Sequence, residues 1–500
     1  MNKVNLTDLP WIPVLSSTGK KDVSLRECFS NADSFESILG DNPLITGSIY
    51  RFLFAVLQRA LVKRLQRSDW KETVAGIVAS KRFPDDVGKY LDKWHGRFFL
   101  FDAKHPFMQT PGLMDDPGDS PLASKKRQHI PVVELAQEIA GGRNFVFFDH
   151  HSGKPEEVDP ATCARWIVAQ QAYTVKCNPN EKSTAKYGPT KHAPGVIGAM
   201  ALISGHTLLE TLALNLVKSE HPVEDVPSWE SDPPQPTGAL KGLAYGPASL
   251  YSWLSRRILV QQNSNGNCEW ARVEAGYELK SPGMDHLFFR SSKQDGPAKF
   301  EHGRNMWRDS LSLIEKDKRP VTVQNYYDLR ELHPELGLGQ NPRFEVIGII
   351  NDKSKVLGWG HARMPIPAAF YNDPVLVGMW AIYLKQVEGT AKALRSAANT
   401  FVFHADCHES VVESIMEVYW IFVDDMFVPD IDKLEAESAT VTKDAEAKKA
   451  MVDQWYSQFW RAAKDTLRDA AGIRTEGNGL LAYGKASAKL NYELNRKKEE

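Results

Sequence analysis

The sequence predicts an α+β protein with a large mixed α/β N-terminal domain, residues 1–365, and a C-terminal four-helix bundle, residues 366–500. Three observations lead to this prediction. Short aromatic and apolar runs alternate with helical patterns, Pro and Gly over the first two-thirds of the chain. Four segments with helical periodicity and almost no strand pattern follow Asp373. The change comes at Pro365-Ile366-Pro367, where we place the domain boundary.

In the N-terminal domain, strands are expected where aromatic or β-branched residues cluster, and helices where apolar residues recur every three or four positions. The expected strands are residues 98–101, 145–148, 288–289 and 344–350. The expected helices are residues 45–65 and 195–217. The proline-rich segment 221–237 predicts an exposed connection.

The C-terminal bundle is predicted from its four periodic segments. The first begins with Asp373 as N-cap and Pro374 in the first turn. The second is expected over about residues 410–427, the third over 445–471, and the fourth over about 477–496. Four amphipathic helices with short to moderate connections are typical of a bundle.

Composition excludes several classes of protein. The 61 Lys+Arg and 63 Asp+Glu residues give a net charge of -2, which argues against a histone-like protein but allows local basic stripes. No apolar run approaches the roughly 20 residues of a membrane span, and the N-terminus lacks the apolar core of a signal peptide. The five cysteines are odd in number and form no CxxC pair. We therefore expect a cytoplasmic protein without a membrane segment, metal or other cofactor.

Two clusters nevertheless contain residue types that bind metals. Asp149, His150 and His151 follow an aromatic run in NFVFFDHH, and clustered Asp and His can hold a divalent ion that activates water. A second cluster, His404, Cys407 and His408, has i, i+3 and i+4 spacing. Neither cluster has an evident second set of ligands, so a polar turn and a helix cap are the favoured interpretations. A metal-dependent phosphoesterase using one of these clusters is kept as the alternative function.

Basic residues gather in one loop and along the predicted bundle helices. The loop between residues 176 and 192 has one acid and four lysines, Lys176, Lys182, Lys186 and Lys191. In the bundle, basic stripes are formed by Lys385, Lys392 and Arg395 on the first helix and by Arg461, Lys464 and Arg468 on the third. Solvated, salt-bridged surfaces and contacts with a phosphate backbone are both consistent with such patterns. The sequence contains no Walker A loop, GxSxG elbow, HExxH motif or Rossmann fingerprint, and we do not expect an enzyme.

Several segments, taken in order, resemble the CasA family, the large subunit of the type I-E CRISPR surveillance complex called Cascade. They are NLTDLPWIPV at 5–14, VSLR at 23–26, HPFMQT at 105–110, and APG at 193–195 leading into LLETLALN at 208–215. The resemblance continues into the bundle and thus covers essentially the whole chain. It implies an N-terminal domain of a family-specific fold and no catalytic activity. The implied partners are other Cascade proteins, the CRISPR guide RNA, double-stranded target DNA and a helicase-nuclease.

The resemblance also implies how the protein works. The family recognises a protospacer-adjacent motif in double-stranded DNA, assists duplex opening and recruits the helicase-nuclease, while guide-RNA pairing reads the remaining sequence. Phe147, Phe148 and Asp149 align with a loop that reaches the 5′ end of the guide RNA, where aromatic rings stack on bases. Lys280 aligns with the motif-reading lysine.

A wedge turn of Asn-Asn-Gln type aligns with Asn351, Asp352 and Lys353, in which lysine replaces glutamine. The loop after Tyr173, TVKCNPNEKSTAKYG, is not glycine-rich as the family's loop is, and glycines allow close approach of the backbone to the minor groove. We therefore expect the motif preference of this protein to differ from that of its relatives.

Overall fold

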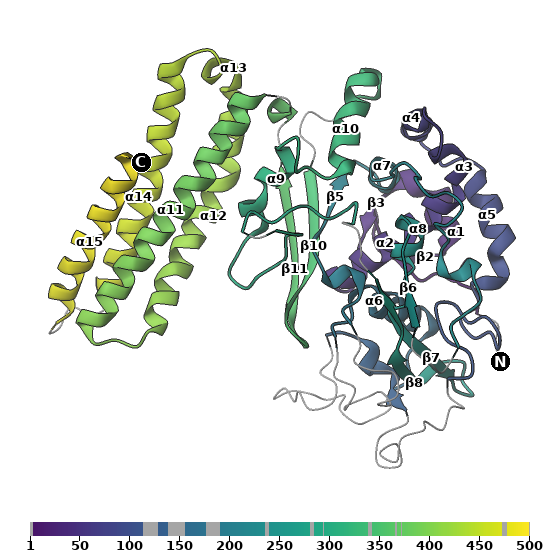
Figure 1. Cartoon of the computed structure of the whole chain (residues 1–500). Helices are drawn as coiled ribbons and strands as arrows, with labels where there is room; N and C mark the ends of the chain where they lie inside the picture. Colours follow the sequence, from purple (N-terminus) through teal and green to yellow (C-terminus); the bar gives the residue numbers. More distant parts are fainter. Residues whose placement is uncertain are drawn as a thin grey trace. The chain divides into compact units, whose positions relative to one another are not determined.

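The computed structural model describes residues 4–113, 129–138, 156–176, 191–235, 240–280, 285–293, 295–338, 343–365, 368–371, 373–472 and 478–499 of the 500. It divides into two compact units, both drawn in Figure 1. The mixed unit contains Met1–Glu301 and Arg319–Met364, and the helical unit contains His302–Lys318 and Pro365–Glu500. From the sequence, the segment His302–Lys318 was assigned to the N-terminal domain, whereas the structure groups it with the helices.

Helix α2 (Pro43–Ala60) is the centre of the mixed unit. Asn42 caps it, because its side chain accepts a hydrogen bond from the Ile45 backbone N–H at 3.0 Å, and Pro43 occupies the first turn. Every residue from position 44 to 58 is buried, so the helix is covered on all sides. The elements packed against it include α5 (Asp86–Trp94), α6 (Pro160–Tyr173), α8 (Pro247–Tyr251) and β10 (Arg343–Asp352). The helix expected over 45–65 is thus confirmed, with a break at Leu61 before the short α3 (Val62–Leu65).

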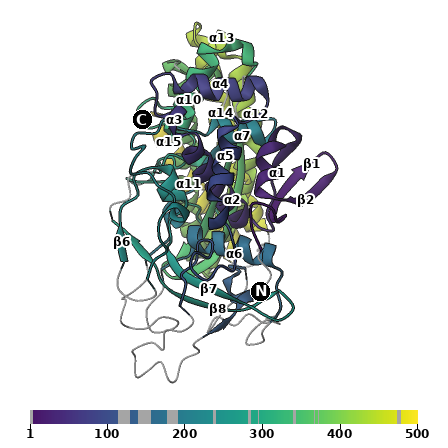
Figure 2. The same ribbon diagram turned by 90° about the vertical axis from the view of Figure 1, so that its right-hand side faces the viewer.

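Small sheets surround this helix. In the described part of the chain there are three three-stranded sheets, ordered β2-β1-β3, β11-β10-β5 and β4-β8-β7, and one pair, β6-β9. Strand β6 pairs with β9 in parallel. Figure 2 shows β1 and β2 at one side of the mixed unit and β6 at the other. The strands are β1 (Ile12–Ser16), β2 (Gly19–Val23), β3 (Phe35–Ile38), β4 (Ile130–Pro131), β5 (Met200–Ser204), β6 (Leu240–Gly242), β7 (Arg256–Gln262), β8 (Cys268–Ala275), β9 (Tyr277–Leu279) and β11 (Lys355–Pro365).

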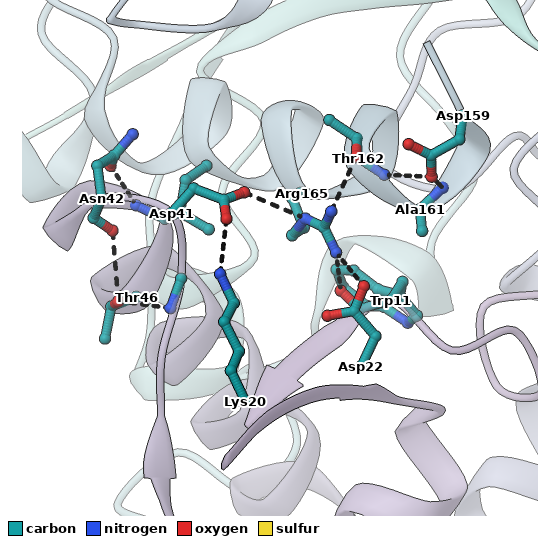
Figure 3. A network of polar contacts seen from close by, with 12 residues as sticks. Trp11, Lys20, Asp22, Asp41, Asn42, Thr46, Asp159, Ala161, Thr162 and Arg165 are labelled. Atoms are coloured by element: carbon teal, nitrogen blue, oxygen red, sulfur yellow. Dashed lines mark hydrogen bonds and ion pairs between the residues drawn. The ribbon is translucent and has the colours of Figure 1, made fainter. Parts of the chain in front are cut away.

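Arg165 of α6 connects that helix to the first of these sheets. Its guanidinium donates to the Trp11 carbonyl at 3.1 Å and to the Asp22 carboxylate at 2.9 Å, as Figure 3 shows. Asp41 lies 3.9 Å from the same guanidinium and 2.7 Å from the ammonium of Lys20. The nearly buried arginine therefore joins β1, β2 and α6 through several acceptors at once.

The other helices of the mixed unit are α1 (Leu25–Ser30), α4 (Trp70–Ser80), α7 (Leu208–Leu214) and α10 (Val321–Leu332). The single helix expected over 195–217 is wrong. The region forms a 3₁₀ turn (Pro194–Val196), the buried strand β5 and then α7, which begins after the capping residue Thr207. A short, fully buried strand shows no alternation, so its apolar run is easily taken for part of a helix.

The remaining sequence expectations in this unit have mixed outcomes. The strand expected over 344–350 is confirmed as part of β10. Residues 98–101 and 288–289 form only isolated bridges, Asn5 with Phe99 and Met200 with Phe288. The segment 221–237 is not exposed throughout, because Trp229 is buried and packs against an aromatic cluster of Phe52, Phe98 and Phe107. Residues 145–148 lie outside the described residues.

The helical unit contains the expected bundle. Its long helices in the described residues are α11 (Pro374–Ala405), α12 (Ser410–Ala436), α14 (Ala445–Gly472) and α15 (Gly479–Glu499), with the short α13 (Ser438–Val441) between α12 and α14. Asp373 caps α11 by accepting from the backbone N–H groups of Val375 and Leu376. Helix α12 continues past Pro429, beyond the end expected from the sequence. The core of the bundle includes Trp380, Tyr383, Tyr419, Trp455 and Phe459.

The segment His302–Lys318 packs against the bundle with its 3₁₀ turn (Met306–Asp309) and α9 (Leu311–Ile314). The Trp307 indole donates to the Asp424 carboxylate at 2.7 Å and stacks on Phe427 with ring centroids 5.0 Å apart. Arg304 and Arg308 both pair with Glu388 of α11, at 3.1 and 2.6 Å. These contacts make the segment an integral part of the helical unit.

Candidate nucleic-acid interface

Hydrogen bonds from a single residue hold both ends of the predicted basic loop in the mixed unit. Arg256, a buried residue at the start of β7, donates to the Val175 carbonyl at 2.8 Å and to the Lys191 carbonyl at 3.1 Å. The Ala193 backbone N–H donates to the Thr174 carbonyl at 2.9 Å. Lys176 and Lys191 are therefore held at the two stems, whereas Lys182 and Lys186 lie outside the described residues.

His192 reports the electrostatic environment of this stem. Its Nδ1 accepts a hydrogen bond from the Lys176 backbone N–H at 3.0 Å. Partial burial lowers the pKa of His192 below its ordinary value, and the nearby positive charges of Lys176, Lys299 and Arg256 lower it further. The lowered pKa agrees with the acceptor role of Nδ1, and its causes show that positive charges surround this ring at the stem.

Lys280 lies beside the same stem. Its backbone N–H donates to the Gly242 carbonyl at 2.9 Å and so continues the pairing of β9 with β6. The carboxylate of Glu278 is 3.8 Å from the Lys191 ammonium and 3.6 Å from that of Lys241. Glu278 and Lys280 are two residues apart, the spacing at which side chains of an extended chain share a face. The exposed lysines Lys191 and Lys241, from two separate segments, thus pair with one acid, and the exposed Lys280 follows that acid by two residues.

The predicted wedge turn joins β10 to β11. Lys353 has a left-handed backbone with φ of 51°, and the Asn351 side-chain amide donates to its carbonyl at 3.1 Å. The side chains of Asp352 and Lys353 are exposed. Ile349, two residues before Asn351, belongs to a buried cluster with Ala172, Tyr173, Ala193 and Val196, against which Val175 packs. Packing therefore places the strand that carries the turn against the loop stem.

The structure thus brings together two groups of residues that the sequence analysis treated separately. Arg256 holds the backbone beside Lys176 and at Lys191, Lys191 pairs with Glu278 two residues before Lys280, and Asn351 follows Ile349 of the cluster at the stem. Lys241, Glu278, His192 and Arg256 belong to this arrangement and were missed from the sequence. Exposed ammonium groups can bind phosphates, and lysine and asparagine side chains can reach base edges. Phe147, Phe148 and Asp149 lie outside the described residues.

The second proposed metal cluster does not form. Helix α11 ends at Ala405, and Asp406 is its left-handed cap with φ of 52°. Cys407 and His408 therefore lie in the connection to α12 instead of sharing a helical face with His404. No group of three or more His, Cys, Asp or Glu residues suited to a metal occurs in the described residues. The first cluster, Asp149, His150 and His151, is outside them.

The basic stripes of the bundle are exposed, but their members differ in their partners. Arg395 pairs with Glu413 at 2.6 Å, and Arg468 pairs with Asp465 at 2.9 Å and Asp469 at 3.4 Å. These two arginines fit the interpretation of a solvated, salt-bridged surface. The other stripe residues are also exposed: Lys385, Lys392, Arg461 and Lys464. Within the part of the chain that the structure describes, no helix has the length and apolar character needed to cross a membrane.

Comparison with known proteins supplies the family. The model of the family described as CRISPR-associated protein Cse1 matches residues 5–466. The chain is also 30% identical over 414 residues to CRISPR-associated protein CasA/Cse1 of Thermus thermophilus, covering 79% of this chain and 75% of the relative. The chain belongs to the Cse1 (CasA) family. The resemblance inferred from the sequence is therefore confirmed.

Solved Cse1 structures share the fold over nearly the whole chain. The crystal structure of Thermus thermophilus CasA superposes with a TM-score of 0.81 at 23% identity, covering 99% of this chain and 100% of that chain. Thermobifida fusca Cse1 gives a TM-score of 0.76 at 21% identity, covering 99% and 97%. A chain of a CRISPR RNA-guided surveillance complex gives a TM-score of 0.75 at 18% identity, covering 99% of both chains. The mixed unit and bundle are thus a Cse1 fold.

Proposed function

We propose that this protein is the non-catalytic large subunit of a Cascade-type, RNA-guided surveillance complex. In that role it recognises the protospacer-adjacent motif in double-stranded DNA, assists opening of the duplex and recruits a helicase-nuclease. Membership of the Cse1 family supports the proposal, as does the likeness of its fold to a chain of a surveillance complex. The observation that carries it is the loop stem at which Lys191 and Lys241 pair with Glu278, and against which the strand that leads to Asn351 packs through Ile349.

The chemistry of the DNA grooves gives these residues different roles. Phosphate contacts position a protein on DNA, whereas contacts with base edges specify sequence. The loop lysines Lys176, Lys182, Lys186 and Lys191 supply phosphate contacts. Lys280 and Lys353 donate to the acceptors that the minor groove presents at every base pair, while Asn351 and Asp352 accept from the amino group found only on guanine.

Two further surfaces complete the proposed function. Phe147, Phe148 and Asp149 contact the end of the guide RNA or a neighbouring subunit, the rings by stacking and the carboxylate by accepting hydrogen bonds. The bundle stripes hold the DNA backbone without regard to sequence. They are Lys385, Lys392, Arg395, Arg461, Lys464 and Arg468.

Motif selectivity tests the central part of the proposal. In the reconstituted complex, Lys280→Ala and Lys353→Gln should each change which motifs are bound in a library of randomised duplexes. A well-made base contact discriminates by about 1–3 kcal/mol, so preferences at individual positions should shift by roughly five- to 150-fold. Lys353→Gln restores the family's wedge residue and should narrow the profile. The matched control is Lys218→Ala, which removes an exposed lysine elsewhere in the mixed unit. Identical profiles for wild type and both variants would refute the assignment.

The bundle stripe on α14 offers an internal comparison. Neutralising the exposed Arg461 and Lys464 to Gln should weaken target binding by the complex equally for all motifs. It should also reduce the slope of log affinity against log salt by about 0.9 for each phosphate that the variant no longer neutralises. Arg468→Gln should have a smaller effect, because its guanidinium is already engaged by Asp465 and Asp469. A salt slope that the double variant leaves unchanged would remove this stripe from the DNA path.

A further inference from the structure

One face of strand β11 exposes an unusual series of side chains. From Leu357 onward exposure alternates along the strand. The odd-numbered positions are Lys355, Leu357, Trp359, His361 and Arg363, here called the β11 outer face. Leu357 is 61% exposed and Trp359 is 36% exposed. Alternate residues of a strand point to the same side of the sheet. Two large apolar groups are thus presented to solvent on the same side as a lysine, a histidine and an arginine.

The neighbouring strand explains why this face is open. The His361 Nε2 lies 2.9 Å from the carboxylate of Glu345, so the β11 outer face and the odd-numbered residues of β10 lie on one side of the sheet. On β10 that side is covered by α2, where a Cβ at Gly47 would lie 3.0 Å from a methyl group of Ile347. Helix α2 therefore shields this side of β10, where Ile347 is fully buried, but does not extend over β11, whose outer face is exposed to solvent.

The opposite side of the sheet fixes this orientation. The Phe300 ring lies so close to Gly360 that an added Cβ would be 2.0 Å from it, and a Cβ at Gly348 would be 2.8 Å from the same ring. Only glycine fits at Gly360. A slip of one residue would turn the outer face inward and place Trp359 or His361 against Phe300, so the register is locked.

These side chains suit a single strand of nucleic acid. An indole stacks on any base, and such stacking is independent of sequence because every base has an aromatic face. Lys355 and Arg363 stand at the two ends of the face and can pair with phosphates. At about 3.3 Å per residue the face is roughly 26 Å long, enough for a few extended nucleotides. Bases within an intact duplex are already stacked on their neighbours and do not offer a free face to Trp359.

We propose that the β11 outer face binds a short stretch of single-stranded nucleic acid, with a base stacked on Trp359 and phosphates paired with Lys355 and Arg363. The source of that strand rests on the proposed function: duplex opening beside the turn at Lys353 frees a strand next to β11. The competing occupant is a protein strand, because β11 is at the edge of its sheet. Cations at both ends of the face favour the polyanion.

The test uses the full-length protein and a fluorescein-labelled oligonucleotide of mixed sequence without a motif, as a single strand and as a duplex. Trp359→Ala should weaken binding of the single strand about tenfold, with duplex binding unchanged, and Trp359→Phe should retain part of the affinity. Tyr245→Ala is the matched control, because Tyr245 is another exposed aromatic of the mixed unit, and it should leave both affinities unchanged. A single strand carrying 5-iododeoxyuridine should photo-crosslink to the β11 peptide.

Three results would overturn the proposal. The first is that Trp359→Ala binds the single strand as tightly as wild type does. The second is that the crosslinks map only to other segments. The third is that Trp359→Ala no longer assembles into the complex although its affinity for the single strand is unchanged. The last result would assign the face to a protein partner. Because the oligonucleotide has no motif, the assay is independent of motif recognition. The two proposals can therefore fail separately. If the motif profiles do not change but single-strand binding depends on Trp359, the β11 outer face still binds a single strand, and only duplex opening at the turn is lost as the source of that strand.

Discussion

Replacing Arg51 by methionine should lower the free energy of unfolding of the mixed unit by about 3–5 kcal/mol, because it leaves a carboxylate buried without its partner. The side chains of Arg51 and Asp285 are 1% and 4% exposed, and their charged atoms are 2.6 Å apart. Asp285 also accepts from the Tyr251 hydroxyl at 2.7 Å and from the Leu287 backbone N–H at 3.0 Å. Burial alone lowers the pKa of Arg51, but the charge of Asp285 raises it above its ordinary value, so the arginine stays charged.

The measurement is unfolding in urea, monitored by hydrogen exchange of the α2 amides, because these amides report on the unfolding of the mixed unit. Arg67→Met is the control, because Arg67 pairs with Asp69 at 2.8 Å on the surface, where an ion pair contributes at most about 1 kcal/mol. Arg51→Met combined with Asp285→Leu removes both charges and should recover much of the loss. A single variant within about 1 kcal/mol of wild type would show that the pair does not hold the core together.

Replacing Trp307 by alanine should destabilise the helical unit by about 3–5 kcal/mol. The indole is 4% exposed and stacks on Phe427, so its removal leaves a cavity between the segment His302–Lys318 and the bundle. It also removes the hydrogen bond to Asp424, whose burial raises the pKa of that carboxyl. The expected loss should appear as a lower melting temperature and faster hydrogen exchange in α12.

Phe403→Ala provides the matched control for this variant, since the Phe403 ring is 80% exposed on α11 and its loss should change stability by less than about 0.5 kcal/mol. A fragment that begins at residue 365 and lacks residues 302–318 should show the same weakness as Trp307→Ala. If this fragment melts like the helical unit of the full chain, the segment is an accessory and not part of the fold.

Elements with their own local determinants could be predicted from the sequence. Helix α11 has an aspartate cap and a proline in the first turn, so its start was expected where it is observed. Helix α2 has a long apolar run and was expected close to its observed bounds. Strand β5 has no such determinant, because a strand buried on both faces lacks alternation. The HPFMQT segment was informative as a family signature, and its role is structural. Gln109 joins the Leu100 carbonyl to the Val260 backbone N–H, while Phe107 packs in the aromatic cluster.

The candidate interface could be predicted only in parts. Lys280 and Asn351 were found because they match family positions, but the placement of their segments depends on the packing of Ile349 against the loop stem and on the pairing of β6 with β9. Arg256 shows why composition was insufficient. An arginine in a strand is expected to be solvated, whereas Arg256 is buried and the backbone carbonyl oxygens of Val175 and Lys191 accept its hydrogen bonds.

The segment His302–Lys318 also has a consequence for synthesis on the ribosome. The segment is synthesised before α11 and α12. Arg304 can pair with Glu388, and Trp307 with Asp424, only after about a hundred further residues have been translated. At synthesis rates of about 5–20 residues per second this delay is roughly 5–20 s. During that time the indole of Trp307, which is buried in the finished protein, lacks its partners in the bundle. Chaperones that bind short apolar peptides should therefore recognise this segment on the nascent chain and release it when α12 has been made.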